Sequence, residues 1–292
     1  MPSPHRPSAG FADHLRALYA AFPFERSLAQ DPLSCVRPYG GDRGQAEVAG
    51  LVAAVLAIGN TTAIRRAFAD VERRVDGDFV GWVERSGRAS TAASLATFRH
   101  RWVRGDQLTH LAREIDAARR TGGSIEELFL DGYRAGGFDR GLDAMSRALR
   151  RPLAGAPTPR GYDRMFPTPL AASHSPCKRL TLYTRWMVRP AYPDLGLWPH
   201  VPTGELRVPL DQHVYWIAYH LGLTARRTRS WATVEEVTAS LRGIEPVDPV
   251  KFDFVLCHTG ISGDCPKRRD ITICGPCLVR PDCRMWRGRV AA

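Results

Sequence analysis

Apolar residues recur at helical spacing along most of the chain. Residues from Phe11 to Phe22 follow this period, and the stretch from Glu47 to Val75 is apolar nearly all round in its first half, as expected of a buried helix. The tetrapeptide Gly59-Asn60-Thr61-Thr62 interrupts that stretch, and a second, amphipathic helix follows it. Further helices are expected over 95–120 and 124–133. Because no internal repeat and no strong alternation of apolar and polar residues, as in strands, is present, the pattern predicts an all-α fold.

Segments rich in proline and glycine separate these helices. Residues 31–44 are expected to form a loop, and residues 150–169 a long connection. In 172–190 a polar turn precedes an amphipathic helix, whose apolar positions are Leu180, Leu182, Tyr183, Trp186 and Met187. Residues 190–208 are expected to be an inserted loop that is accommodated on the surface, where long loops cost little.

The charge balance adds an expected partner to this helical pattern. The formal net charge is +11, and arginine far outnumbers lysine. A general preference for arginine explains the choice of residue but not the excess of charge, which favours a polyanion, most simply nucleic acid. No apolar run is long enough to span a membrane, and residues 1–10 lack the apolar centre of a signal peptide. With seven cysteines and no secretion signal, we expect a cytoplasmic, monomeric protein without a membrane partner.

Four cysteines lie close together near the C-terminus, at Cys265, Cys274, Cys277 and Cys283, with the spacing C-x8-C-x2-C-x5-C. Thiolates are soft ligands for zinc and for iron–sulfur centres. A disulfide framework is disfavoured because nothing else in the chain is typical of a secreted protein. Zinc remains the alternative, but the x2 and x5 gaps favour a [4Fe–4S] cluster, as do the basic residues in and beside the loop: Lys267, Arg268, Arg269, Arg280, Arg284, Arg287 and Arg289.

This ending resembles the iron–sulfur loop of the helix-hairpin-helix DNA glycosylases, endonuclease III and MutY. Their last three cysteines also run C-x2-C-x5-C, whereas their first gap is usually six residues rather than eight. The fragment VPLDQHVYWIAYHLGL resembles the segment that carries their helix-capping aspartate, here Asp211. The fragment DPVKFDFVLCHTG resembles the helix that leads into their cluster loop, with His258 and Gly260 before the first ligand and Cys257 as a buried helix cysteine. The resemblance covers 172–286 well and 47–75 weakly, and is closest to a bacterial branch related to these enzymes.

The resemblance implies two helical lobes. Residues 1–46 would pack with the cluster lobe, residues 47–223 would form a helical-barrel lobe with insertions near 76–170 and 190–208, and residues 224–292 would form the C-terminal lobe with the cluster loop. A damaged or mispaired base, flipped out of double-stranded DNA, would enter a pocket between the lobes.

The same resemblance implies a catalytic pair, Lys178 and Asp211. A partly desolvated amine at a helix N-terminus can attack an electrophilic carbon, and Lys178 would attack the sugar C1′. Asp211 would stabilise the developing positive charge and assist deprotonation of the lysine. Alternatively, Lys178 is a surface cation and Asp211 only a helix cap. The implied activity is a base-excision DNA glycosylase with abasic-site lyase activity; the alternatives are a non-catalytic DNA-binding protein on this scaffold or a zinc-stabilised nucleic-acid-binding module.

DNA contacts are implied at several positions. Asn60 would enter the duplex beside the extruded base, although a helix cap explains it equally well. Where the family carries a glycine-rich hairpin that grips a phosphate, this chain has Ser173-His174-Ser175-Pro176-Cys177, so serine hydroxyls would supply the donors. The basic-aromatic cluster of Arg99, Arg101, Trp102 and Arg104 is either a nucleic-acid surface or a solvated face. The full set of expected DNA contacts is Asn60, Ser173, Ser175, Arg179, Gln212, His213, Lys267, Arg268, Arg269 and Arg280.

Overall fold

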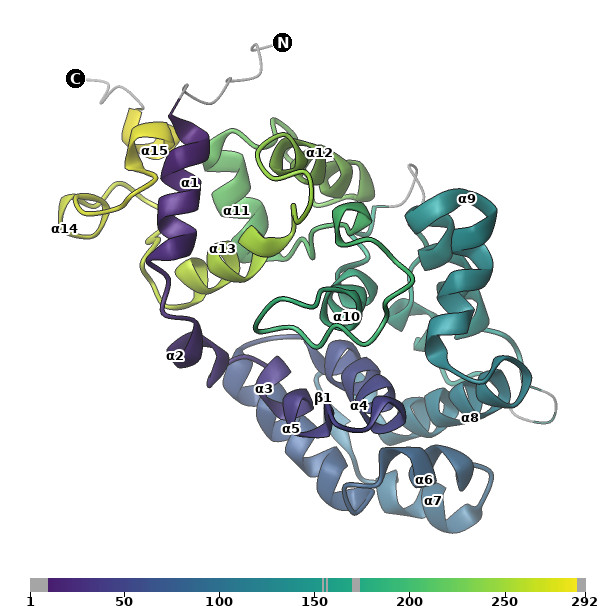
Figure 1. Ribbon diagram of the computed structural model, residues 1–292. Coiled ribbons are helices and arrows are strands. Elements are labelled where there is room, and N and C mark those ends of the chain that lie inside the picture. Colours follow the sequence, from purple (N-terminus) through teal and green to yellow (C-terminus); the bar gives the residue numbers. More distant parts are fainter. Residues whose placement is uncertain (1–9, 154, 156, 170–173, 288–292) are drawn as a thin grey trace. The chain divides into compact units, whose positions relative to one another are not determined.

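The computed structural model describes residues 10–153, 155, 157–169 and 174–287 (Figure 1). In this part of the chain, helices dominate and the only sheet is a pair of two-residue strands, β1 (Arg99–His100) and β2 (Val103–Arg104). The predicted all-α class is therefore confirmed. None of the described helices combines the length and the apolarity that crossing a bilayer requires.

The chain divides into two compact units. The first unit comprises residues 1–24, 170–178 and 202–292, and the second comprises 25–169 and 179–201. This division places residues 202–223 with the C-terminal helices, whereas the resemblance placed them in the barrel lobe. The Lys178–Asp211 pair and the cysteine loop consequently all fall in the first unit.

The second unit contains most of the helices. They are α3 (Leu33–Val36), η1 (Arg37–Tyr39), α4 (Arg43–Leu56), α5 (Thr61–Arg74), α6 (Phe79–Glu84), α7 (Ala89–Leu95), α8 (Gly105–Gly122), α9 (Ile125–Ala148), η2 (Tyr162–Met165) and α10 (Lys178–Val188) after its first residue. The short helix α2 (Phe24–Leu28) leads into the unit. Helix α4 forms its centre, since ten consecutive residues from Ala46 to Val55 are buried.

The first unit joins the two ends of the chain. Its elements are α1 (Phe11–Ala20), η3 (Thr203–Glu205), α11 (Gln212–Leu221), α12 (Trp231–Arg242), α13 (Lys251–Ile261), α14 (Ile271–Cys274), η4 (Arg280–Asp282) and α15 (Arg284–Arg287). Figure 1 shows α1 beside α15, and His14 Nδ1 lies 2.7 Å from the buried carboxylate of Asp282. Helix α1 thus holds the C-terminal segment in place.

Side-chain caps start the helices where the sequence breaks. The Asn60 side chain accepts a hydrogen bond from the Ala63 N–H at 2.8 Å and begins α5. Asp42, Asp78 and Ser124 cap α4, α6 and α9 in the same way. Each cap satisfies a backbone donor that has no partner within its helix.

Two expected boundaries are wrong. Residues 31–44 are not a plain loop, because they contain α3, η1 and the first residues of α4. The helix expected from residue 95 begins only at Gly105, after the hairpin of β1 and β2. A Cβ at Gly105 would lie 1.7 Å from the carbonyl oxygen of Leu95, so glycine is required where the helix starts against this turn.

The surface loop expected over 190–208 is also wrong in its placement. Trp198 is fully buried, and its Nε1 donates a hydrogen bond to Glu47 Oε1 at 2.9 Å. Asp194, also buried, pairs with Arg185 at 3.1 Å and with Arg189 at 3.1 Å. The segment is rich in proline, and its single tryptophan and single aspartate anchor it to the core.

Glu47 is the buried centre of the second unit. Its carboxylate accepts hydrogen bonds from Arg43 Nε at 3.1 Å, from Trp198 Nε1, and from the Ile125 N–H at 3.2 Å. The Tyr183 hydroxyl donates to its backbone carbonyl at 3.1 Å. Glu47 on α4 therefore connects the start of α9 and the 190–201 segment through its carboxylate, and α10 through its backbone carbonyl.

Replacement of Glu47 by Ala should lower the free energy of unfolding by about 3–5 kcal/mol, because the buried donors of Trp198 and Ile125 lose their acceptor. Urea unfolding followed by tryptophan fluorescence measures the shift. Glu84→Ala, at an exposed helix end, is the control and should change the midpoint little. Equal midpoints for the two variants would contradict the role of Glu47.

Candidate functional site

Lys178 and Asp211 lie at the first turns of two helices. Lys178 is the first residue of α10, and Asp211 caps α11, where its Oδ1 accepts the Val214 N–H at 2.8 Å. The Lys178 Nζ lies 3.8 Å from Asp211 Oδ2, with 30% and 13% of the respective side chains exposed. The structure therefore brings the two predicted catalytic residues together and leaves the amine accessible.

Cys257 adds a contact that the sequence analysis missed. Its Sγ, on α13, donates a hydrogen bond to Asp211 Oδ2 at 3.4 Å. The residue is half-buried rather than a core cysteine. A thiol and an ammonium group thus share one carboxylate oxygen, while the other oxygen is held by the helix cap. The pattern of the sequence gives no signal for this contact, because 46 residues separate the two partners.

Gly260 allows α13 to approach α11 closely. A Cβ at Gly260 would lie 2.8 Å from both Cβ and Nδ1 of His213, so any larger residue would push the imidazole away. Burial lowers the pKa of His213, and the nearby Lys267 and Lys178 lower it further, against an opposing effect of Asp211. The imidazole is therefore neutral at pH 7 and packs between the helices beside the pair.

The turn before α10 differs from a glycine hairpin in its donors. Ser175 Oγ accepts the Cys177 N–H at 3.2 Å, and Cys177 is buried in the left-handed region at φ +49°. The Ser175 side chain thus stabilises the turn that directly precedes Lys178. Ser173, another expected phosphate donor, lies outside the described residues.

The four cysteines of the predicted metal centre lie on a loop that begins after α13. All four are half-buried. Burial raises the pKa of the Cys277 thiol, and the charges of Cys283, Cys265 and Cys274 raise it further, so the four sulfurs lie within electrostatic range of one another. No disulfide involves any of the seven cysteines, all of which are described.

The four cysteines have the chemistry of a metal site, but their side chains are not arranged as ligands of one. Four thiols with few other donors have the chemistry of a zinc or iron–sulfur site. In the described ranges, however, no three His, Cys, Asp or Glu side chains are arranged so as to hold a metal ion. The donor chemistry therefore fits the predicted centre, and the ligand geometry remains a prediction.

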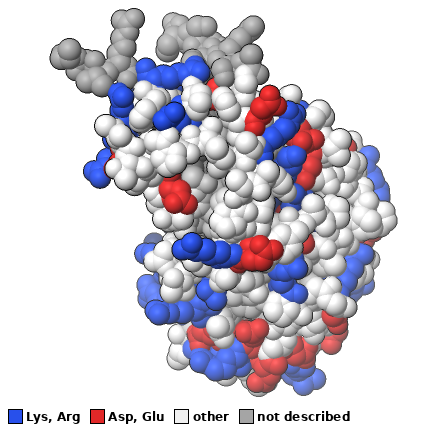
Figure 2. Space-filling view, turned by 60° about the vertical axis from the view of Figure 1, so that its left-hand side comes forward, with Lys and Arg blue, Asp and Glu red and all other residues white. Residues whose placement is uncertain are grey.

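Cation–π contacts organise the basic residues of the loop. The guanidinium groups of Arg269 and Arg280 lie 4.8 and 5.1 Å from the ring centroid of Trp286. Arg280 also donates to the Gly275 carbonyl at 2.7 Å. Arg268 and Arg269 are exposed, and Lys267 is half-buried. Figure 2 shows Lys and Arg side chains along the upper left margin of the view.

The remaining expected DNA contacts have local roles. Asn60 is exposed and caps α5, as expected from the interpretation of this residue as a helix cap. Arg179 donates to the carbonyls of Arg164 at 2.8 Å and Met165 at 3.2 Å and lies over the Trp102 ring. Gln212 is exposed at the first position of α11. Asn60 belongs to the second unit, so the structure does not join it to the Lys178–Asp211 pair. Arg179 belongs to the same unit, although it directly follows Lys178 in the chain.

Comparisons with known proteins give one match. Searches of curated proteins and of solved structures found no significant similarity. A family model described as "Protein of unknown function (DUF2400)" matches residues 31–262, which include Lys178, Asp211 and Cys257 but end before Cys265. Because this match covers well over half of its 292 residues, the chain belongs to the DUF2400 family.

Proposed function

We propose that this protein is a base-excision DNA glycosylase with abasic-site lyase activity. The observation that carries the proposal is the 3.8 Å approach of Lys178 Nζ to Asp211 Oδ2; both residues belong to the first unit, and each lies at the start of a helix. A lysine and an aspartate so placed are the two groups that attack at a sugar carbon requires. The net charge of +11 supports a polyanionic substrate such as double-stranded DNA.

The chemistry begins with proton transfer from the Lys178 ammonium group to Asp211. The neutral amine attacks C1′ of the flipped nucleotide, and the bond from C1′ to the base breaks, so that the base leaves with the electron pair. The departing base takes up the proton that Asp211 received, and the carboxylate restored in this way stabilises the positive charge on the sugar. Ring opening gives a Schiff base between Lys178 and C1′. Loss of a proton from C2′ then breaks the C3′–O bond and cleaves the strand.

Cys257 has a supporting role in this scheme. Its thiol donates to the same oxygen that faces Lys178, and so fixes the orientation of the carboxylate without adding charge. When Lys178 is deprotonated and moves toward the sugar, Asp211 Oδ2 keeps one hydrogen-bond donor. The helix cap at Oδ1 supplies the other donor, so the carboxylate stays in place through the reaction.

The cysteine loop would hold a [4Fe–4S] cluster through Cys265, Cys274, Cys277 and Cys283, with zinc as the alternative. The centre would be structural: by tying both ends of the loop together, it would fix the exposed Arg268 and Arg269 for contact with DNA phosphates. None of the catalytic steps passes through it. The proposal assigns the DNA contacts to this basic surface and does not specify which base is removed.

Borohydride trapping tests the nucleophile. We expect a covalent adduct with a duplex that contains an abasic site, because borohydride reduces the C=N bond of the Schiff base. Lys178→Arg should lose the adduct while keeping the positive charge, since a guanidinium group is a poor nucleophile. Lys251→Ala, a lysine paired with Glu245, is the control and should keep it. An adduct of undiminished yield in Lys178→Arg would place the reactive amine elsewhere.

Asp211→Asn tests the carboxylate. Asparagine is an equally good helix cap, so α11 should remain folded, as circular dichroism can verify. The rate of base release in single-turnover assays, over duplexes with oxidised pyrimidines, uracil or mismatches, should fall by about 10²–10⁴-fold. If Asp211→Asn released every base at the wild-type rate, the assigned role of Asp211 would be wrong.

Optical spectra and metal analysis test the centre. Protein purified without oxygen should be brown, absorb at about 400 nm and contain iron and sulfide in equal amounts, as iron–sulfur proteins do. Cys277→Ser should lose the colour, and Cys35→Ser, remote in sequence from the loop, should retain it. A colourless protein with bound zinc would establish the alternative centre.

A further inference from the structure

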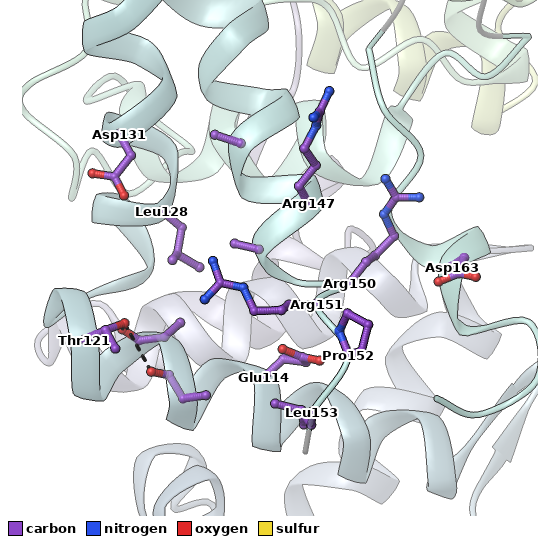
Figure 3. Close-up of a pocket in the computed structure, with 14 residues that line it drawn as sticks. Glu114, Thr121, Leu128, Asp131, Arg147, Arg150, Arg151, Pro152, Leu153 and Asp163 are labelled. Atoms are coloured by element: carbon purple, nitrogen blue, oxygen red, sulfur yellow. Dashed lines mark hydrogen bonds between the residues drawn. The ribbon is translucent and has the colours of Figure 1, made fainter. Parts of the chain in front are cut away.

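A second candidate site lies wholly within the second unit. A pocket with a volume of about 750 Å³ is formed by α8, α9 and the residues that follow α9 (Figure 3). This volume is in the range of pockets that bind small organic molecules. Its walls carry small and branched apolar side chains, from Ala117, Ala118, Leu128, Ala144, Ala148 and Leu153. The proposed glycosylase chemistry uses none of these residues.

A buried carboxyl group faces this pocket. Glu114, on α8, is only 3% exposed, and its Oε1 has no hydrogen-bond partner among the described residues. His110 Nε2 lies 3.4 Å away on the next turn of the helix, but it forms no hydrogen bond either. An ionised carboxyl oxygen that is buried without a partner is costly, and this cost favours the protonated, neutral form of Glu114.

One of the three arginines that line the pocket is available for a ligand. Arg147 pairs with Asp143 at 2.8 Å, and Arg150 Nε donates to the Ser146 carbonyl at 3.3 Å. Arg151 forms no side-chain hydrogen bond or ion pair with the described residues. In Figure 3 its side chain extends between Leu128 and Glu114. The pocket therefore offers one uncommitted guanidinium group beside an unsatisfied carboxyl group.

The charge state of Glu114 makes these two groups compatible with an anion. Burial raises the pKa of Glu114 to about 7, against a lowering effect of Arg151. At neutral pH the carboxyl is therefore about half protonated, and the protonated form can donate a hydrogen bond to an anionic oxygen. When Glu114 is ionised, it instead repels an anion and competes for Arg151.

The other titratable groups around Glu114 do not remove the preference for its protonated form. Burial lowers the pKa of His110, and Arg113 lowers it further, against a raising effect of Asp163, so the surroundings of the imidazole disfavour its charged form. Burial raises the pKa of Tyr162, which also stays neutral. The carboxylates of Asp131 and Asp163 are on exposed residues that line the pocket, where water screens them.

We propose that this pocket binds a small organic anion with a single negative charge, whose oxyanion group pairs with Arg151 and the Glu114 carboxyl group and whose apolar body lies against the alanine and leucine side chains. A carboxylate and a singly charged phosphate have the shared chemistry that this pairing recognises. One uncommitted arginine matches one negative charge.

Calorimetric titration of the full-length protein with benzoate tests the site, because benzoate keeps a fixed charge between pH 6 and pH 8. The fraction of protonated Glu114 falls from about nine-tenths at pH 6 to about one-tenth at pH 8 for a pKa of about 7. The affinity for benzoate should therefore be about tenfold higher at pH 6. Phenyl phosphate, titrated in parallel at pH 6, shows whether the site prefers a phosphate or a carboxylate group. Inorganic phosphate, titrated at the same pH, distinguishes an adventitious ion from an organic ligand.

Two variants assign the effect to its residues. Glu114→Gln keeps a hydrogen-bond donor but cannot titrate, so benzoate should bind with the same affinity at both pH values. Arg151→Gln should weaken binding at least tenfold, whereas Arg88→Gln, an exposed arginine outside the pocket, should not change it. Circular dichroism establishes that each variant is folded. The proposal would be overturned if neither benzoate nor phenyl phosphate bound, or if Arg151→Gln left their binding unchanged. Binding of inorganic phosphate alone would indicate an adventitious ion only and would overturn it as well.

Discussion

The close contact of α13 with α11 at Gly260 is the constraint on which the Lys178–Asp211 site depends. A Cβ there would lie 2.8 Å from the Cβ of His213, so the two helices could not approach as they do. Because α13 lies this close, Cys257, one turn earlier, reaches the carboxylate that caps α11. The same helix ends at Ile261, just before the cysteine loop starts. The absence of a side chain at Gly260 thus allows the helix contact through which Cys257 reaches Asp211.

The caps and periodic helices could be predicted from the sequence because they depend on local physics. Asp211 was expected at a helix N-terminus, and Asn60 had a cap as one of its two interpretations; both side chains accept a backbone N–H three residues ahead. Helix α1 was expected from its apolar period. The Lys178–Asp211 approach was implied only by resemblance, since 33 residues separate the two and no local rule links them.

What the sequence could not predict depends on burial over long separations. The proline-rich segment 190–208 was expected on the surface, yet Trp198 reaches Glu47 across 151 positions of the chain. Similarly, the pattern of α8 shows Glu114 as one more polar helical residue. Only the packing of η2 and of the residues after α9 buries that carboxyl and raises its pKa to about 7. Hydropathy reports which positions are apolar, but it does not report which polar positions will lose their water.

The cysteine loop and the Lys178–Asp211 pair are connected by charge. The family match ends at residue 262, so the helices that position Lys178, Asp211 and Cys257 lie within it and the four cysteines lie beyond it. Lys267, on the loop, is nevertheless close enough to lower the pKa of His213, which packs beside Asp211. Under the proposed function, a centre that stiffens the loop would therefore fix a positive charge next to the pair, where it would attract a phosphate that flanks the sugar. In that proposal the loop would contribute to the site through electrostatic potential, and its cysteines would need no direct contact with the sugar.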